Sequence, residues 1–188
     1  GGSTVNASGA EGDNLTLLAP NGDYRWDRML GERADDFRVT PMIMRGRTGH
    51  LVVVYRSSSE SGSDVMIEDW TTGGELVWQT NVPGSANGAL SFVRTAPDGR
   101  VFFMADTFNS FDFGGKSFTV EPGSGRVFYG SLDASGKLLH VDLLESNVSN
   151  SSAFGIGVDA SNQPVMLSRE NSDSLVPDGD LVLTKMSH

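Results

Sequence analysis

Two short turn motifs alternate along this chain, and their spacing constrains the fold more than any other feature of the sequence. The centres of the first motif are 52 and 62 residues apart, and those of the second are 50 and 63 residues apart. The first motif is centred on Gly22, Gly74 and Gly136, and the second on Gly49, Gly99 and Asn162. Glycine and asparagine tolerate the left-handed backbone of tight turns. Two turns per period predict two hairpins, and therefore four antiparallel strands, in each repeat.

The residues around the first motif agree in character from copy to copy. Four residues before the glycine stand Leu18, Trp70 and Leu132, and four residues after it stand Trp26, Trp78 and His140. Columns filled by large apolar residues are typical of packing between repeated sheets. We therefore expect the indoles to lie in the core, with stacking on a sugar ring as the alternative.

The segments between the turns predict an all-β fold. They are short apolar runs rich in β-branched and aromatic residues, and no window of eleven or more residues has helical periodicity. The charged segment 26–37 is predicted to be a loop. Four-stranded units at this period are typical of β-propeller blades. We predict one domain, 1–188, that forms a propeller-like arc of three to four blades, with repeat units at about 1–35 (partial), 36–86, 87–148 and 149–188 (partial).

This number of blades is too small for a standard closed ring, which usually needs four to eight. The favoured interpretation is that the chain is part of a larger propeller. The alternatives are an arc completed by a second chain and a small arrangement that is not a propeller. Because exposed edge strands pair readily with other strands, we expect the rest of the propeller or another chain to cover them.

The longer second interval of both series predicts an insertion within Thr107–Ser124. Its four phenylalanines are Phe108, Phe111, Phe113 and Phe118. They are candidates for contact with a partner or ligand. Ordinary decoration of the repeat is the favoured alternative.

Three segments resemble the bacterial β-propeller repeat family of the SBBP type. They are G-V-D-A-S-N-Q-P-V at 157–165, F-D-F-G-G-K at 111–116 and V-F-Y-G-S-L-D-A-S-G-K-L-L at 127–139. Such repeats are common in secreted and cell-surface proteins of myxobacteria and their relatives. The resemblance implies an extracellular or cell-surface bacterial protein that acts as a binding or adhesion module.

Composition excludes several classes of function. The formal net charge is −10 and only three residues are lysine, so binding to a nucleic-acid backbone is disfavoured. The chain has no cysteine, which excludes disulfides, thiolate metal sites and thiol nucleophiles. No apolar run approaches the roughly 18 residues of a membrane helix, so we expect no membrane insertion.

The candidate chemical groups are aspartates, histidines and paired carboxylates. Asp98, Asp133 and Asp159 precede turn residues, where we expect them to stabilise the turns; calcium binding is the alternative. His50, His140 and His188 occupy different repeat positions without partners at metal-ligand spacing. The pairs Asp35-Asp36 and Glu68-Asp69 are expected on the solvated surface, with adjacent side chains on opposite faces of a strand.

We therefore expect no catalytic residues, no metal site and no cofactor. The predicted function is a non-catalytic binding or structural module that contacts a protein or carbohydrate partner through propeller loops. The alternative is a fragment of a propeller enzyme, either a glycan-active hydrolase or a quinoprotein-like dehydrogenase. The second of these is suggested by Gly74–Trp78, which resembles the tryptophan-docking turn of quinoprotein repeats.

Overall fold

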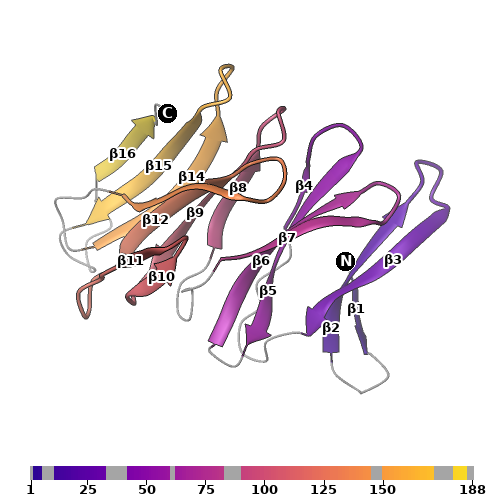
Figure 1. The fold of residues 1–188 in the computed structure, drawn as a ribbon, viewed down its shortest axis with the longest axis horizontal. Coiled ribbons are helices and arrows are strands. Elements are labelled where there is room, and N and C mark those ends of the chain that lie inside the picture. The colour runs from indigo at the N-terminus through magenta and orange to yellow at the C-terminus, as the bar shows by residue number, and fades with distance from the viewer. Residues whose placement is uncertain are drawn as a thin grey trace. The chain divides into compact units, whose positions relative to one another are not determined.

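The computed structural model describes residues 2–5, 11–32, 42–59, 62–82, 90–144, 150–171 and 180–185. Within these ranges the regular structure consists of antiparallel β-strands, which confirms the prediction of an all-β chain (Figure 1). The same ranges contain no helix of the length and apolar character that would span a membrane.

The strands form four sheets and one small hairpin. The first sheet has the order β1 (Gly2–Val5), β2 (Glu11–Leu18), β3 (Tyr24–Glu32). The second has the order β4 (Met42–Arg45), β5 (His50–Ser59), β6 (Gly62–Thr71), β7 (Leu76–Val82). The third has the order β8 (Leu90–Thr95), β9 (Val101–Thr107), β12 (Arg126–Leu132), β13 (Leu138–Leu143). The fourth has the order β14 (Asn150–Val158), β15 (Pro164–Asn171), β16 (Asp180–Lys185).

The separate hairpin consists of β10 (Phe111–Phe113) and β11 (Lys116–Phe118). It lies inside the predicted insertion, between β9 and β12 of the third sheet. In the second and third sheets we call the four strands a, b, c and d in chain order. By their turns, the first sheet then carries positions b to d and the fourth carries positions a to c.

One of the local predictions was wrong. The segment expected to be a loop from Trp26 onward belongs to β3 as far as Glu32. Its charges do not prevent a strand, because Trp26 and Leu30 are buried while Asp27, Arg28 and Met29 between them are exposed. Pairing with β2, which supplies Leu15 and Leu17, holds this half-buried strand in place.

The six turn centres adopt the backbone that their residue types favour. Gly22, Gly74 and Gly136 have φ of 89°, 86° and 81°, and Gly49 and Gly99 have φ of 78° and 89°. Asn162 has φ of 59° and is the only residue other than glycine with positive φ in the described part of the chain. Every a–b and c–d hairpin therefore reverses through a residue in the left-handed region.

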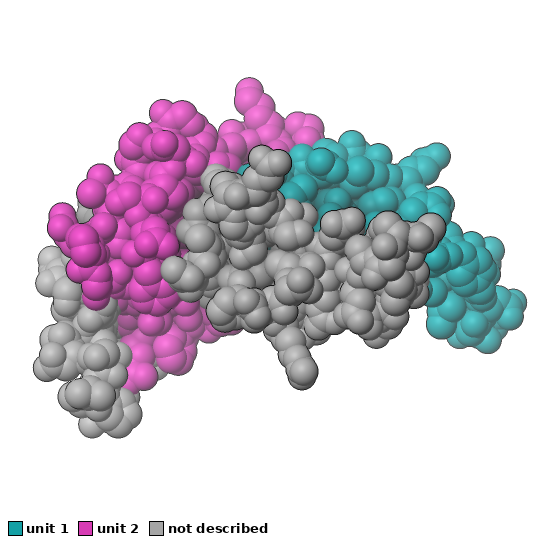
Figure 2. Space-filling view, turned by 90° about the horizontal axis from the view of Figure 1, so that it is seen from below, with its two compact units in different colours: residues 1–81 teal, residues 82–188 magenta. Residues whose placement is uncertain are grey.

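The chain divides into two compact units, residues 1–81 and residues 82–188 (Figure 2). In the first unit, one face of the first sheet packs on one face of the second. The packing face of the first sheet contains Leu15, Trp26 and Leu30, and we call it the front face of that sheet. The packing face of the second sheet contains Val53, Tyr55 and Trp70, and we call it the rear face of that sheet. The rings of Trp26 and Trp70 are stacked at a centroid distance of 6.3 Å.

The second unit repeats this arrangement. The front face of the third sheet, with Phe102, Met104 and Val127, packs on the rear face of the fourth, with Ile156 and Met166. Polar bonds join the same two sheets. Arg100 donates to the carbonyl of Asn162 at 2.8 Å, and the carboxylate of Asp106 accepts the amide of Ala153 at 2.7 Å. In both units, therefore, a front face meets the rear face of the following sheet.

Candidate functional site

Two adjacent carboxylates on β6 are buried and point to opposite faces of the second sheet. Glu68 is 5% exposed and lies on the rear face. Its two oxygens accept hydrogen bonds from the hydroxyl of Tyr55 and the indole of Trp70, each at 2.8 Å. Burial raises the pKa of the Tyr55 hydroxyl, and its hydrogen bond to Glu68 acts in the same direction. This network joins β5 to β6 in the middle of the unit's core.

Asp69 lies on the front face of the same sheet and is 2% exposed. The Nδ1 atom of His50 lies 2.9 Å and 3.1 Å from its two carboxylate oxygens, and Arg47 Nη2 lies 4.0 Å away. Burial raises the pKa of the Asp69 carboxyl, while His50 and Arg47 partly offset that shift. The pair fixes the orientation of the imidazole against β6.

The prediction that Glu68 and Asp69 lie on the solvated surface was wrong, whereas their placement on opposite faces was right. The physical reason is that each carboxylate has hydrogen-bonding partners on neighbouring strands, which compensates for the loss of water. The pair Asp35-Asp36 lies outside the described residues, as does His188.

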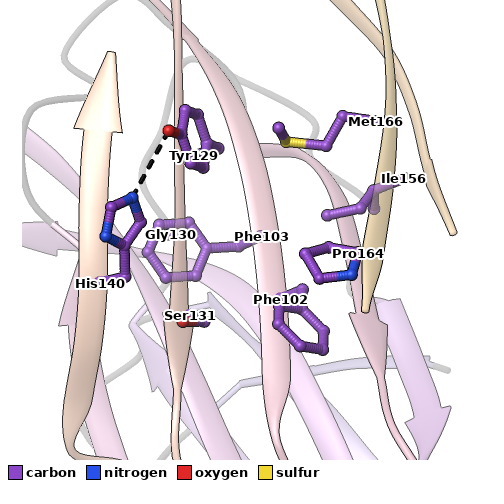
Figure 3. Close-up of a pocket in the computed structure, with 9 residues that line it drawn as sticks. All are labelled: Phe102, Phe103, Tyr129, Gly130, Ser131, His140, Ile156, Pro164 and Met166. Atoms are coloured by element: carbon purple, nitrogen blue, oxygen red, sulfur yellow. Dashed lines mark hydrogen bonds between the residues drawn. The ribbon is translucent and has the colours of Figure 1, made fainter. Parts of the chain in front are cut away.

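His140 lies beside a small pocket in the second unit (Figure 3). Its ring is 5.4 Å from that of Tyr129, and its Nε2 is 3.5 Å from the Tyr129 hydroxyl. The pocket is otherwise mostly apolar, and its remaining lining residues are Phe102, Phe103, Gly130, Ser131, Ile156, Pro164 and Met166. Its volume is about 10 Å³. A space of this size holds about one water molecule, so an organic cofactor does not fit there.

The three predicted turn aspartates have structural contacts. The carboxylate of Asp98 accepts the amide of Arg100 at 3.1 Å, and that of Asp133 accepts the amides of Ser135 and Lys137 at 2.8 and 3.0 Å. Asp159 repeats the Asp133 pattern with the amides of residues 161 and 163. Hydrogen bonds from Ser135 hold the pKa of Asp133 below its ordinary value. Each carboxylate therefore stabilises its own turn.

The described part of the chain contains no cluster of side chains that could hold a metal ion. No group of three or more histidine, aspartate or glutamate side chains is placed there to hold an ion. Calcium binding thus stays an untested alternative.

The phenylalanines of the insertion differ in their surroundings. Phe111 and Phe118 are 9% and 7% exposed and stack on each other at 5.0 Å, and Phe111 also packs against Phe128 of the third sheet at 4.9 Å. Phe113 lies 6.3 Å from Phe103. These rings cover the rear face of the third sheet, so we do not retain them as partner contacts. Phe108 is 50% exposed and remains a candidate.

Two of the three indoles also pack inside their unit. Trp26 and Trp70 are each 8% exposed. The Trp26 indole donates to the carbonyl of Thr72 at 3.1 Å, and a Cβ added to Gly74 would lie 2.9 Å from its ring. These two rings are therefore not available as a platform for a sugar. Trp78 is partly buried.

Exposed apolar residues that the sequence motifs did not single out follow the c–d turns of the first, second and third sheets. Apolar residues two or three positions after each turn glycine are exposed, with exposed fractions of 62% for Tyr24, 43% for Leu76, 43% for Val77 and 54% for Leu139. They lie on β3, β7 and β13, which are edge strands of their sheets within the described residues. The signal was present in the sequence, since these residues share repeat columns. Sequence alone did not separate these exposed columns from the buried ones.

Comparisons with known proteins give a distant structural similarity. No family model matches the chain, and no curated protein matches it. The chain is similar to a solved protein of unknown function from Bacteroides caccae, with 14% sequence identity and a TM-score of 0.48. The match covers 95% of this chain and 57% of that protein, so this chain spans little more than half of its length.

Proposed function

We propose that the chain is a non-catalytic binding module that contacts a protein partner through its c–d hairpins. The observation that carries this proposal is the recurrence of exposed apolar side chains directly after the turn glycines, at Tyr24, Leu76, Val77 and Leu139. Apolar side chains that are exposed on the edge strand of a sheet favour association with another polypeptide. Side chains hold two of these hairpins in shape: the carboxylate of Asp133 accepts the amide of Lys137 at 3.0 Å, and the hydroxyl of Thr71 accepts the amide of Glu75 at 3.2 Å.

A propeller-type arrangement is part of the proposal. Four-stranded antiparallel sheets repeat along the chain, and in each unit the front face of one sheet packs on the rear face of the next. Repeated sheets of this kind are typical of propeller blades. A secreted or cell-surface bacterial location, with a role in adhesion, follows from the resemblance to SBBP-type repeats alone.

A protein partner is favoured over a glycan by the chemistry of the exposed side chains. Leu76, Val77 and Leu139 are aliphatic, whereas sugar rings are usually held against flat aromatic faces. Trp26 and Trp70 are occupied in the core. A carbohydrate partner is therefore an outcome of the test rather than part of the proposal.

The test compares a display library of 12-residue peptides with an array of defined oligosaccharides, using the full chain. We expect enrichment of peptides with alternating apolar residues, and at least tenfold weaker binding of those peptides to the Leu76→Ser/Val77→Ser double variant. Glu75→Gln, an exposed change on the same turn, is the matched control and should bind like the wild type. Binding of glycans without binding of peptides would overturn the proposal.

A propeller enzyme is a second candidate, and one contact favours it. Trp26 packs over Gly74 and donates to the Thr72 carbonyl of the next c–d turn, in line with the resemblance of this turn to quinoprotein repeats. Titration with pyrroloquinoline quinone and calcium separates the candidates. A saturable change in cofactor absorbance would favour the enzyme, and an unchanged spectrum would favour the binding module.

A further inference from the structure

The first and fourth sheets each expose a residue whose repeat equivalents in the second and third sheets are buried or half-buried. On the c strands, the column four residues before the turn glycine holds Leu18, Trp70 and Leu132, and their exposed fractions are 54%, 8% and 0%. Trp70 lies on the rear face of its sheet, against Trp26. Leu18 is therefore the exposed member of a rear-face column that is otherwise buried.

The opposite face shows the same contrast in the fourth sheet. Five positions after each a–b turn centre, a residue of the b strand faces a cross-strand partner on the c strand. The three pairs are Val54 with Ile67, Met104 with Tyr129, and Leu167 with Leu183. Ile67 is 0% exposed and Tyr129 is half-buried, whereas Leu183 is 70% exposed. Leu183 is thus the exposed member of a front-face column.

The neighbours of these two residues have the same character. On the rear face of the first sheet, Met29 is 41% exposed. On the front face of the fourth sheet, Leu167 lies opposite Leu183. The two faces also carry opposite charges among their described side chains, with Asp27 on the first sheet and Arg169 on the fourth. Both faces therefore expose apolar side chains, and each also carries a charged residue, acidic on the first sheet and basic on the fourth.

From this pairing of faces we propose that the chain associates with a second copy of itself, head to tail. The rear face of the first sheet in one copy packs on the front face of the fourth sheet in the other. Leu18 of one copy meets Leu183 of the other. Inside each unit a front face already packs on a rear face, so the contact between copies repeats an interface that this sequence forms twice. Because different surfaces meet, the contact is heterologous and gives a closed ring or a growing chain of copies.

The proposal concerns sheet faces rather than the c–d hairpins, so it does not depend on the proposed function. The experiment is sedimentation velocity, with light scattering, of the full chain between about 1 and 300 µM. We expect the mass of the wild type to rise to two or more copies. We expect Leu18→Asp and Leu183→Asp each to stop the growth of larger species and to weaken association at least tenfold. Ile43→Asp is the control for an added charge on an exposed strand of another sheet, and it should associate like the wild type.

Mixing the two interface variants tests the geometry. Leu18→Asp keeps an intact front face and Leu183→Asp keeps an intact rear face, so an equimolar mixture should form a dimer of one copy of each. Far-UV circular dichroism confirms that each variant is folded. A wild type that is monomeric at all concentrations overturns the proposal. A mixture of the two folded variants that stays monomeric also overturns it. The same holds if only one of the two substitutions, Leu18→Asp or Leu183→Asp, blocks association.

Discussion

At the scale of single residues, the hydroxyl of Tyr55 has the clearest energetic role. It donates to a buried carboxylate, and hydrogen bonds to charged groups are stronger than neutral ones. Tyr55→Phe leaves Glu68 buried with the Trp70 indole as its remaining partner in this network. We expect the free energy of unfolding to fall by about 1.5–3 kcal/mol, measured by urea denaturation. Tyr24→Phe removes an exposed hydroxyl bonded to Asp27 and should change stability little.

The same tyrosine predicts how stability responds to alkali. Its pKa is raised in the folded chain from the ordinary 10.0, so the folded form retains the phenolic proton more strongly than the unfolded form. The stability that the phenolic proton contributes is fully present below pH 10.0 and is lost as the pH rises through the folded pKa. Tyr55→Phe should therefore lose less stability than the wild type above pH 10. An identical alkaline decline in both proteins would assign it to other groups.

Asp69 predicts a response in acid. Burial raises its pKa above the ordinary 3.8, so the stability linked to its proton is fully present below pH 3.8 and is lost as the pH rises through the folded value. As the pH rises, the unfolding free energy of the wild type should therefore fall relative to that of Asp69→Asn. His50→Gln should steepen this change, because His50 opposes the shift. A difference that is constant with pH would contradict this interpretation.

At the scale of elements, the turns could be predicted from the sequence and the buried carboxylates could not. A backbone with positive φ favours glycine or asparagine, so these two residue types mark the six turn centres in the sequence. The burial of Glu68 and Asp69 depends on partners from another strand, Tyr55 and His50. The partners are set by the register of β5 against β6, which no local pattern specifies.

The β10–β11 hairpin offers a matched pair of substitutions at its turn. Gly114 and Gly115 have φ of 61° and 77°, so alanine is strained at either position. A Cβ at Gly114 would clash with the Cδ2 atom of Leu138, whereas nothing lies within 4 Å of one at Gly115. We expect Gly115→Ala to cost about 1–2 kcal/mol from the backbone alone. Gly114→Ala should cost about 0.5–1.5 kcal/mol more, because the end of the Leu138 side chain must leave its preferred rotamer.

Chemical denaturation of the two variants measures this difference, because the strain of the left-handed backbone is common to both. Near-UV circular dichroism reports whether the phenylalanines of the hairpin stay packed on the third sheet. Equal destabilisation by the two alanines would mean that the hairpin does not pack tightly against β13. The insertion would then be a loosely attached element rather than a cover for the rear face.

At the scale of the whole molecule, charge and apolar surface act in opposite directions on self-association. Each copy carries a formal net charge of −10 at pH 7, so two copies repel each other at low ionic strength. The faces proposed to meet are mainly apolar, and burial of apolar surface is not weakened by screening. Salt shortens the Debye length from about 30 Å at 0.01 M to about 3 Å at 1 M. The dissociation constant for self-association should therefore fall several-fold between 20 mM and 500 mM NaCl, as measured by sedimentation at fixed protein concentrations. Weaker association at high salt would instead indicate that ionic contacts dominate the interface.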